Sequence, residues 1–376
     1  MKSHFYLDPE IVFLNHGSFG AVPKVVYEDL WHWQRKMEMD SVQFLETDIF
    51  PQLAESRRVL GEFIGCQGDD IVYCPNPTHA VNAVARSLDL KPGEEVLSTN
   101  HIYGALDYTW SHICNEKGAK FIKAEIPLPI ASNEAFLDNF LSHCDEQTKL
   151  IFISHLTSMT ACLFPVEEIM AFANERSISV FIDGAHIPGQ FPLAISELNP
   201  DFYTGACHKW MCAPKGTSFL YVKSELQNKI DPPVISWGWK IDLSDGSRFL
   251  NKHEWQGTRD MTPYLTVPSA IRFMKENDWE SHAEENRKLA RETRRQVLDI
   301  TGTKTICPES WLGQMASIPL PVSDAQFFKQ QLLEKFKIQV PVFEWEGENY
   351  LRFSFHLYNT EEDAKRLIEA VEFLLS

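Results

Sequence analysis

The stretch of sequence that decides the fold is SVFIDGAHIPGQFPLAISELNPDFYTGACHKW, residues 179–210. It opens with an apolar run at residues 179–182, which predicts a buried strand and is followed directly by Asp183. A second short apolar run at residues 201–204 leads into a His-Lys-Trp triplet centred on Lys209. An acidic side chain therefore ends one predicted strand, and a lysine follows the next.

Ligands of open α/β sheets bind beyond the carboxyl ends of the strands, where both side chains are expected. Pyridoxal 5'-phosphate (PLP) needs such a pair: a lysine holds its aldehyde as a Schiff base, and a carboxylate keeps its pyridine nitrogen protonated. Taken singly, Asp183 is explained equally well as a helix N-cap, and Lys209 as a solvated charge. Together, in this order and spacing, they predict a PLP site.

Composition narrows the class of protein. The 376 residues are enough for a large domain and a smaller one, and an apolar fraction of 44% is typical of a globular chain. A formal net charge of −17 would repel phosphate backbones, so nucleic-acid binding is not expected. No apolar run is long enough to span a bilayer, so membrane insertion is not expected either.

Cysteine usage and the N-terminus bear on the compartment. The first residues, MKSHFYLDPE, have no apolar core behind the basic residue, so no signal peptide is expected. The eight cysteines are scattered from Cys66 to Cys307 without a C-x-x-C pair, so a disulfide framework is not expected. We therefore expect a cytoplasmic protein.

Short apolar runs alternate with helical stretches between residues 71 and 222, which predicts an α/β fold with a mostly parallel seven-stranded sheet covered on both faces. The strands are expected at residues 71–73, 95–98, 120–126, 149–154, 179–182, 202–204 and 218–222. Beyond residue 263, long helices precede strands near 314–319, 337–342 and 349–355, the pattern of a small α+β domain. We predict an N-terminal arm (1–20), a large PLP-binding domain (21–255) and a small C-terminal domain (256–376).

Several loops contain further candidates, each with a plainer explanation. Thr78, after Pro77, is expected to cap a helix whose free N–H groups bind an anion, or simply to cap it. Tyr103 follows a strand and either stacks on a planar ring or packs against the sheet. Ser158 either offers a hydroxyl to the ring or forms a turn.

Two candidates lie in the last third of the chain. Thr258, in Gln-Gly-Thr-Arg-Asp, either meets a phosphate or belongs to a linker turn. Arg352 alternates with apolar neighbours on a predicted strand, so it shares a face with Ser354. An arginine there needs a partner, which is either a substrate carboxylate or an internal salt bridge.

In this order, the segments resemble class V aminotransferases of PLP fold type I, and most of all their isopenicillin N epimerase-like branch. The resemblance covers residues 15–359 and rests on Asn-His-Gly-Ser-Phe-Gly at 15–20, Asp-Gly-Ala-His at 183–186, His-Lys-Trp at 208–210, Gly-Thr-Arg-Asp at 257–260 and Arg-Phe-Ser at 352–354. It implies the aspartate aminotransferase-like fold, with a large sheet domain and a small C-terminal α+β domain.

The resemblance also implies roles. Lys209 would bind the cofactor and shuttle protons, Asp183 would pair with the pyridinium nitrogen, and His186 would contact the phenolic oxygen side. Tyr103 would stack on the ring, where related desulfurases have a histidine. The remaining cofactor contacts would come from Pro77, Thr78, Ser158, Thr204 and His208.

The family forms homodimers with shared active sites, so Thr258 would reach the phosphate bound by the neighbouring subunit. Arg352 would bind the substrate carboxylate, and Asn15 and His16 would line the substrate entrance. No metal is expected in this site.

The resemblance leaves the reaction open. Once Lys209 removes the Cα proton of an amino acid, the outcome is epimerisation, transamination or loss of a β-substituent. Epimerase or aminotransferase chemistry is the first expectation, with His16 or Tyr103 as a second acid/base, and a C–S lyase is the alternative. Cysteine desulfurases of this family use a nucleophilic cysteine on a loop shortly before the arginine that binds the substrate carboxylate. No cysteine lies between Leu312 and Arg352 here, so a persulfide-forming desulfurase is disfavoured.

Three other classes are less well supported. A non-catalytic relative would not need Lys209, Asp183 and Arg352. A nicotinamide-dependent dehydrogenase would need a Gly-x-Gly-x-x-Gly after a strand, which this chain lacks. A metal enzyme could use Cys207, His208 and Cys212 as ligands. We favour a role for His208 beside Lys209 instead, with the two cysteines in the core.

Overall fold

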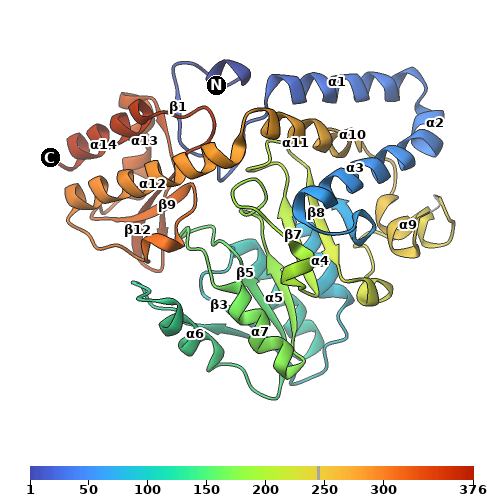
Figure 1. Cartoon of the computed structure of the whole chain (residues 1–376). Coiled ribbons are helices and arrows are strands. Elements are labelled where there is room, and N and C mark those ends of the chain that lie inside the picture. Colours follow the sequence, from blue (N-terminus) through green and yellow to red (C-terminus); the bar gives the residue numbers. More distant parts are fainter. Residues whose placement is uncertain (244–245) are drawn as a thin grey trace.

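The computed structural model describes residues 1–243 and 246–376, and its centre is a seven-stranded sheet (Figure 1). The strand order is β2-β8-β7-β6-β5-β3-β4. The bounds are β2 (Ile71–Cys74), β3 (Glu95–Thr99), β4 (Lys120–Ala124), β5 (Thr148–Ser154), β6 (Ser179–Asp183), β7 (Phe202–Ala206) and β8 (Ser218–Val222). Strands β3 to β7 pair in parallel, and β8 pairs antiparallel with β2 and β7. The predicted α/β class and mostly parallel sheet are confirmed.

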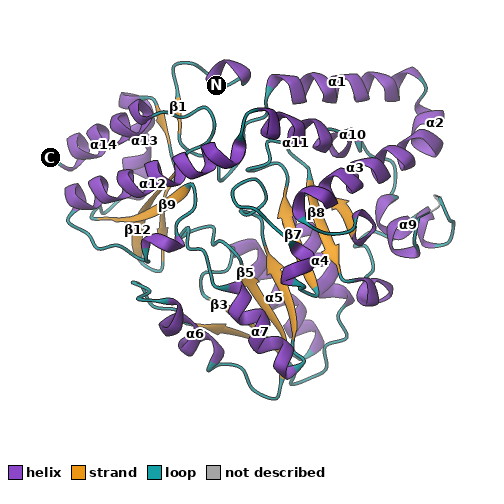
Figure 2. Ribbon diagram, viewed as in Figure 1, coloured by secondary structure: helices purple, strands orange, loops and turns teal. Residues whose placement is uncertain are grey.

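Helices cover both faces of this sheet (Figure 2). Successive residues of β5 enter different cores: Ile151 and Ile153 pack into one, and Phe152 packs into the other, with Trp110. The helices are α1 (Lys24–Met39), α2 (Ser41–Gln43), α3 (Ile49–Ile64), α4 (Pro77–Ser87), α5 (Gly104–Lys117), α6 (Asn133–Leu141), α7 (Val166–Arg176), α8 (Ile195–Leu198), α9 (Arg248–Glu254), α10 (Thr262–Leu265), α11 (Val267–Glu276), α12 (Trp279–Thr301), α13 (Ala325–Phe336) and α14 (Glu361–Leu375).

A second unit is built on a three-stranded antiparallel sheet in the order β11-β12-β9. Its strands are β9 (Met315–Leu320), β11 (Val342–Trp345) and β12 (Glu348–Ser354), and α12 packs against both β9 and α14. The single strand predicted at residues 337–342 is divided into β10 (Ile338–Gln339) and β11. Pro341 lies at the break, because it has no N–H for a ladder bond.

The N-terminal arm joins this second unit. Strand β1 (Val12–Phe13) pairs in parallel with β10, so a segment near the start of the sequence lies beside one near its end. The N–H of Ser354 donates to the carbonyl of Leu14 at 2.9 Å, which fixes the residues that follow the arm's strand. Helices α10 and α11 pack instead on α1 and α3.

None of the helices in the described ranges combines the length and the apolar character needed to cross a membrane.

Candidate active site

The ends of three neighbouring strands lie level at one edge of the large sheet. The register pairs Ser154 of β5 with Asp183 of β6, and Asp183 with Thr204 of β7. Lys209 lies in the turn after β7, where its charge acts on the Asp183 carboxylate. The fold therefore brings together the acid and the lysine that the sequence places 26 residues apart.

Gly184 is required by close packing at this edge. A Cβ on residue 184 would lie 2.1 Å from the hydroxyl oxygen of Tyr203. The same hydroxyl lies 3.2 Å from Nδ1 of His155. The strand can thus turn out of the sheet after Asp183 only because residue 184 has no side chain.

Lys209 has an imidazole neighbour whose tautomer is defined. Its Nζ lies 3.1 Å from Nε2 of His186, and Nδ1 of His186 accepts the indole N–H of Trp210 at 3.3 Å. Because an indole nitrogen only donates, the proton of the neutral imidazole is on Nε2. This N–H points at the lysine nitrogen, an arrangement that favours a neutral amine with a free lone pair.

Burial sets the protonation of these groups. It lowers the pKa of Lys209 to about 8, while Asp183 raises this pKa and Arg352 lowers it. Burial raises the pKa of Asp183, and Lys209 and the N–H of Ala185 at 3.1 Å oppose that shift. Burial also lowers the pKa of His186 well below its usual value, and the charge on Lys209 acts in the same direction. A lysine with a pKa near neutrality is suited to act as a base.

Helix α4 begins at Pro77, directly after β2, but its predicted cap is wrong. The side chain of Asn76, and not of Thr78, accepts the N–H of His79 at 2.9 Å, so Thr78 lies inside the first turn. Asparagine is a strong N-cap, and proline is favoured at the next position. The N–H groups of the first turn have no helical acceptor and are available to an anion.

The other predicted phosphate residues differ in their freedom. Nδ1 of His208 donates to the carbonyl of Thr217 at 2.9 Å, and burial lowers the pKa of His208 to about 4, so Nε2 of the neutral ring can accept a hydrogen bond but cannot donate one to a phosphate. The hydroxyl of Thr204 donates to the carbonyl of Phe219 at 2.8 Å and so supports the sheet instead. Thr258 is exposed on the loop between α9 and α10.

Arg352 of β12 is buried among neutral acceptors. Its Nη1 donates to the carbonyl and, at 3.3 Å, to the hydroxyl of Ser158, and its Nη2 donates to the hydroxyl of Ser18 at 2.6 Å. Burial lowers its pKa to about 10, and half-exposed Tyr103 raises it. Within the described ranges no carboxylate pairs with this guanidinium. The internal salt bridge considered as an alternative is therefore absent from this part of the chain.

Asn15 and His16 lie in different surroundings. His16 is fully buried beneath Lys209, with Nε2 2.9 Å from the lysine carbonyl and Nδ1 2.8 Å from the hydroxyl of Tyr358. The predicted position at the substrate entrance is therefore wrong for His16, and both of its ring nitrogens already have hydrogen-bond partners. The side-chain oxygen of Asn15 is buried without a hydrogen-bond partner among the described residues.

The segment before Arg352 leaves no room for a long cysteine-bearing loop. Glu346 and Gly347 join β11 to β12 directly, with φ angles of 51° and 80°. Positive φ at both central residues is typical of a tight two-residue hairpin turn. The cysteines nearest in sequence to Lys209, Cys207 and Cys212, are buried, and burial raises the pKa of each thiol.

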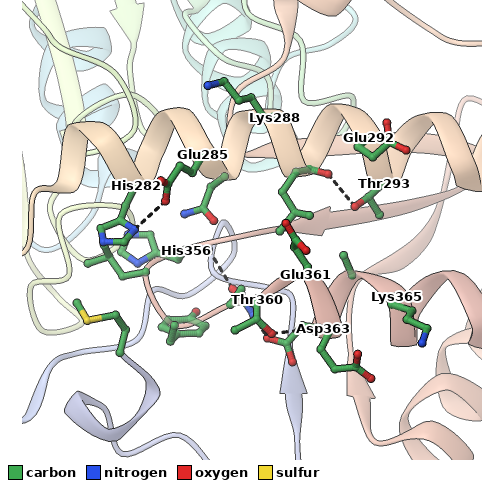
Figure 3. Close-up of a pocket in the computed structure, with 18 of the residues that line it drawn as sticks. His282, Glu285, Lys288, Glu292, Thr293, His356, Thr360, Glu361, Asp363 and Lys365 are labelled. Carbon is green, nitrogen blue, oxygen red and sulfur yellow. Dashed lines mark hydrogen bonds and ion pairs between the residues drawn. The ribbon is translucent and has the colours of Figure 1, made fainter.

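A cleft of about 1260 Å³ lies elsewhere, between the N-terminal residues, α12 and the start of α14 (Figure 3). Its walls include His282, Glu285, Lys288, His356 and Asp363. Its lining contains none of the residues predicted to bind the cofactor or the substrate. The chemistry expected at Lys209 therefore does not take place in this cleft.

Comparison with known proteins assigns the family. Residues 22–367 match the sequence model of the family described as aminotransferase class-V. The chain belongs to the class V aminotransferase family. This confirms the predicted family and the prediction that the protein is an enzyme of that family.

Similar proteins cover nearly the whole chain. The isopenicillin N epimerase of Amycolatopsis lactamdurans is 31% identical over 98% of this chain and 96% of its own length. A probable chloroplastic L-cysteine desulfhydrase of Arabidopsis thaliana is 27% identical over 98% of this chain and 84% of its own. A structure of C-DES with glycine covalently linked to its PLP cofactor has a TM-score of 0.86 at 19% identity and covers 99% of both chains. The predicted PLP fold type I is confirmed.

The residues of the site fit PLP, the cofactor predicted from the sequence and confirmed by the family. Asp183 is buried and Lys209 is partly buried at the strand ends, and the free N–H groups at the start of α4 suit a phosphate. The hydroxyl of Thr217, whose carbonyl contacts His208, is buried with no hydrogen-bond partner in the described ranges. When bound, PLP supplies an electron sink for negative charge at Cα of an amino acid.

Proposed function

We propose that this enzyme exchanges the Cα proton of an α-amino acid and epimerises it, with Lys209 as the base on one face. The observation that supports this best is the place of Lys209, whose Nζ lies 3.1 Å from Nε2 of His186 in the turn beyond the strand that pairs with β6, and burial there lowers its pKa to about 8. Near physiological pH such an amine is neutral far more often than an ordinary lysine, and the neutral form can accept a proton. Asp183, which remains beside it, would keep the pyridine nitrogen of PLP protonated.

Arg352 would hold the substrate by its carboxylate. Within the part of the chain that the structure describes, the buried guanidinium of Arg352 hydrogen-bonds to neutral groups of Ser18 and Ser158 and to no carboxylate, whereas a buried cation is normally paired with an anion. A carboxylate would supply the missing anion through two parallel hydrogen bonds. This anchors the amino acid so that its Cα meets Lys209.

Epimerisation also needs an acid on the opposite face, and Tyr103 is the candidate. His16 is no longer suitable, because its nitrogens contact Lys209 and Tyr358. Tyr103 is half exposed at the start of α5, and its hydroxyl is close enough to influence Arg352. We infer that Tyr103 stacks on the ring and returns a proton from the face opposite Lys209.

A C–S lyase is the second candidate, and one observation favours it. Elimination of a sulfur leaving group from Cβ needs only one base, and Lys209 is such a base without help from Tyr103. It needs no nucleophilic cysteine either, which agrees with the tight turn at Glu346 and Gly347. A desulfhydrase among the similar proteins is consistent with this chemistry.

We further propose that two copies of the chain share their active sites. Thr258 is exposed on its loop, and its role in phosphate binding would then be performed in the partner's site. The loop at residues 256–260 would then belong to the dimer contact.

The experiment is a D₂O incubation of the PLP-loaded enzyme with single L-amino acids, including cysteine and cystine. Deuterium at Cα is measured by NMR, the D-isomer by chiral chromatography, and pyruvate and sulfide by colour assays. Epimerisation predicts deuterated D-isomer, and Tyr103→Phe should keep Cα exchange while losing the D-isomer. Tyr108→Phe, an exposed tyrosine on the same helix, is the matched control. Formation of pyruvate and sulfide without the D-isomer would reject the epimerase proposal and support the C–S lyase.

A further inference from the structure

Two buried histidines contact the backbone immediately after the reactive lysine. The rings of His16 and His356 are stacked, with centroids 3.7 Å apart and planes 8° apart. Nε2 of His16 lies 2.9 Å from the carbonyl oxygen of Lys209, and Nε2 of His356 lies 3.2 Å from that of Trp210. One ring comes from the N-terminal arm and the other follows β12, so opposite ends of the chain meet at two consecutive carbonyls.

The hydrogen bonds define which nitrogen of His16 is protonated. The backbone N–H of Ala21 points at Nδ1 at 3.4 Å, and the hydroxyl of Tyr358 lies 2.8 Å from the same atom. A backbone N–H only donates, so Nδ1 is an acceptor and the proton is on Nε2. Nε2 therefore donates to the carbonyl of Lys209. Burial lowers the pKa of both rings, that of His356 to about 4, so the pair is neutral.

The arm is packed tightly around this carbonyl. The N–H of Cys212 donates to it at 3.1 Å, and a Cβ on Gly20 would lie 2.3 Å from it. Residue 20 must therefore be glycine for the arm to approach. The Asn-His-Gly-Ser-Phe-Gly segment thus contacts the main-chain carbonyl of Lys209. The hydroxyl of Ser18, in the same segment, accepts a hydrogen bond from Arg352.

A metal site is the competing explanation. The potential ligand atoms of His16, Cys212 and His356 all lie within 4.8 Å of one another. However, Nδ1 of His16 already receives two hydrogen bonds, and its Nε2 is bonded to a carbonyl. Rings stacked nearly in parallel also do not direct their lone pairs at one ion, as tetrahedral coordination requires.

We propose that His16 and His356 are positioning residues for Lys209. By fixing the carbonyls of residues 209 and 210, they hold the lysine so that Nζ stays buried beside His186 and Asp183. The arm then acts on the position of the base and not on the substrate. This inference rests on the proposed role of Lys209 as the reacting lysine.

The test is a pair of substitutions that separate the two nitrogens of His16. The amide nitrogen of glutamine can replace Nε2, whereas asparagine reaches only the position of Nδ1. His16→Gln should keep the bond to Lys209, and His16→Asn should lose it. Each variant loses hydrogen bonds on one side of the ring, so a purely structural role predicts a similar fall in Tm for both.

Two readouts follow, and only one requires catalysis. After PLP is removed, the pH dependence of Lys209 acetylation is measured by mass spectrometry. His16→Asn should raise the apparent pKa of Lys209 from about 8 by roughly one unit, as hydration of the amine increases. Its kcat for Cα exchange should fall roughly tenfold to a hundredfold with KM little changed. His16→Gln should resemble the wild type in both.

His356→Gln and His356→Asn repeat the comparison at the carbonyl of Trp210, in case an arm variant does not fold. Equal effects of glutamine and asparagine at both positions, or an effect on KM alone, would overturn the proposal. An altered Lys209 pKa in a protein without Cα exchange would support the positioning role and reject only the proposed function.

Discussion

Replacement of Arg352 by lysine tests how this site recognises its substrate. The variant keeps a positive charge but replaces a planar fork by a single ammonium group. Arg352 has two terminal nitrogens, each already oriented by a serine, so a carboxylate can receive two parallel bonds. Lysine provides at most one of these in the same direction. The loss of one charge-assisted hydrogen bond is worth about 1.5–3 kcal/mol.

This free energy predicts a decrease in kcat/KM of roughly tenfold to 150-fold. Burial strengthens the prediction, because it already lowers the pKa of Arg352 to about 10. A lysine in the same place has a lower intrinsic pKa, so its charge would be partly lost as well.

The assay is steady-state Cα exchange with an amino acid and with its amide, which has no carboxylate. The loss should appear with the acid and nearly vanish with the amide. Arg294→Lys is the matched control, because Arg294 is also buried but donates to the carbonyl of Cys307 at 3.1 Å. Equal losses with acid and amide, or equal losses in the two variants, would refute the assignment of Arg352.

Three further outcomes are expected. The rate at which the cofactor-free protein takes up PLP should rise with pH and level off above a midpoint near 8, because burial lowers the pKa of Lys209 and only the neutral amine reacts. A midpoint near about 10.4, the ordinary lysine value, would contradict this. Iodoacetamide should leave activity intact, since the partly exposed thiols Cys66 and Cys144 have pKa values raised by burial to about 12 and 11. Activity lost in step with alkylation would reinstate a cysteine nucleophile. A mixture of Lys209→Ala and Thr258→Ala proteins should gain activity after subunit exchange, relative to each variant alone. The reason is that one of the two sites in a mixed dimer then has both Lys209 and Thr258. No gain would place Thr258 in the site of its own subunit.

The large sheet was predictable because its strands are local apolar runs. Strand β8 has the predicted bounds, and β6 differs by the inclusion of Asp183. The pairing of β1 with β10 could not be predicted, because each strand has only two residues and the two strands are more than 300 residues apart in sequence.

Within the site, the sequence predicted which residues meet but not how each one is used. Asp183 and Lys209 were found because strand ends converge at one edge of a parallel sheet. His16 was misplaced: the resemblance puts it at the substrate entrance, and only the fold shows that it lies buried beneath Lys209. Thr204 looked available for a phosphate, but its hydroxyl bonds to the neighbouring strand at Phe219. A side chain's free atoms depend on its neighbours, which spacing along the chain does not reveal.

The central claim is that Lys209 binds PLP and is the base. The most direct measurement is the visible absorbance of the purified protein incubated with PLP, for the wild type and for Lys209→Ala. We expect a yellow band in the wild type that changes when an amino acid is added, and that is shifted or lost in the variant. Mass spectrometry after borohydride reduction should then find the cofactor attached to Lys209. A wild-type protein that stays colourless with PLP, or a label on another lysine, would contradict the account.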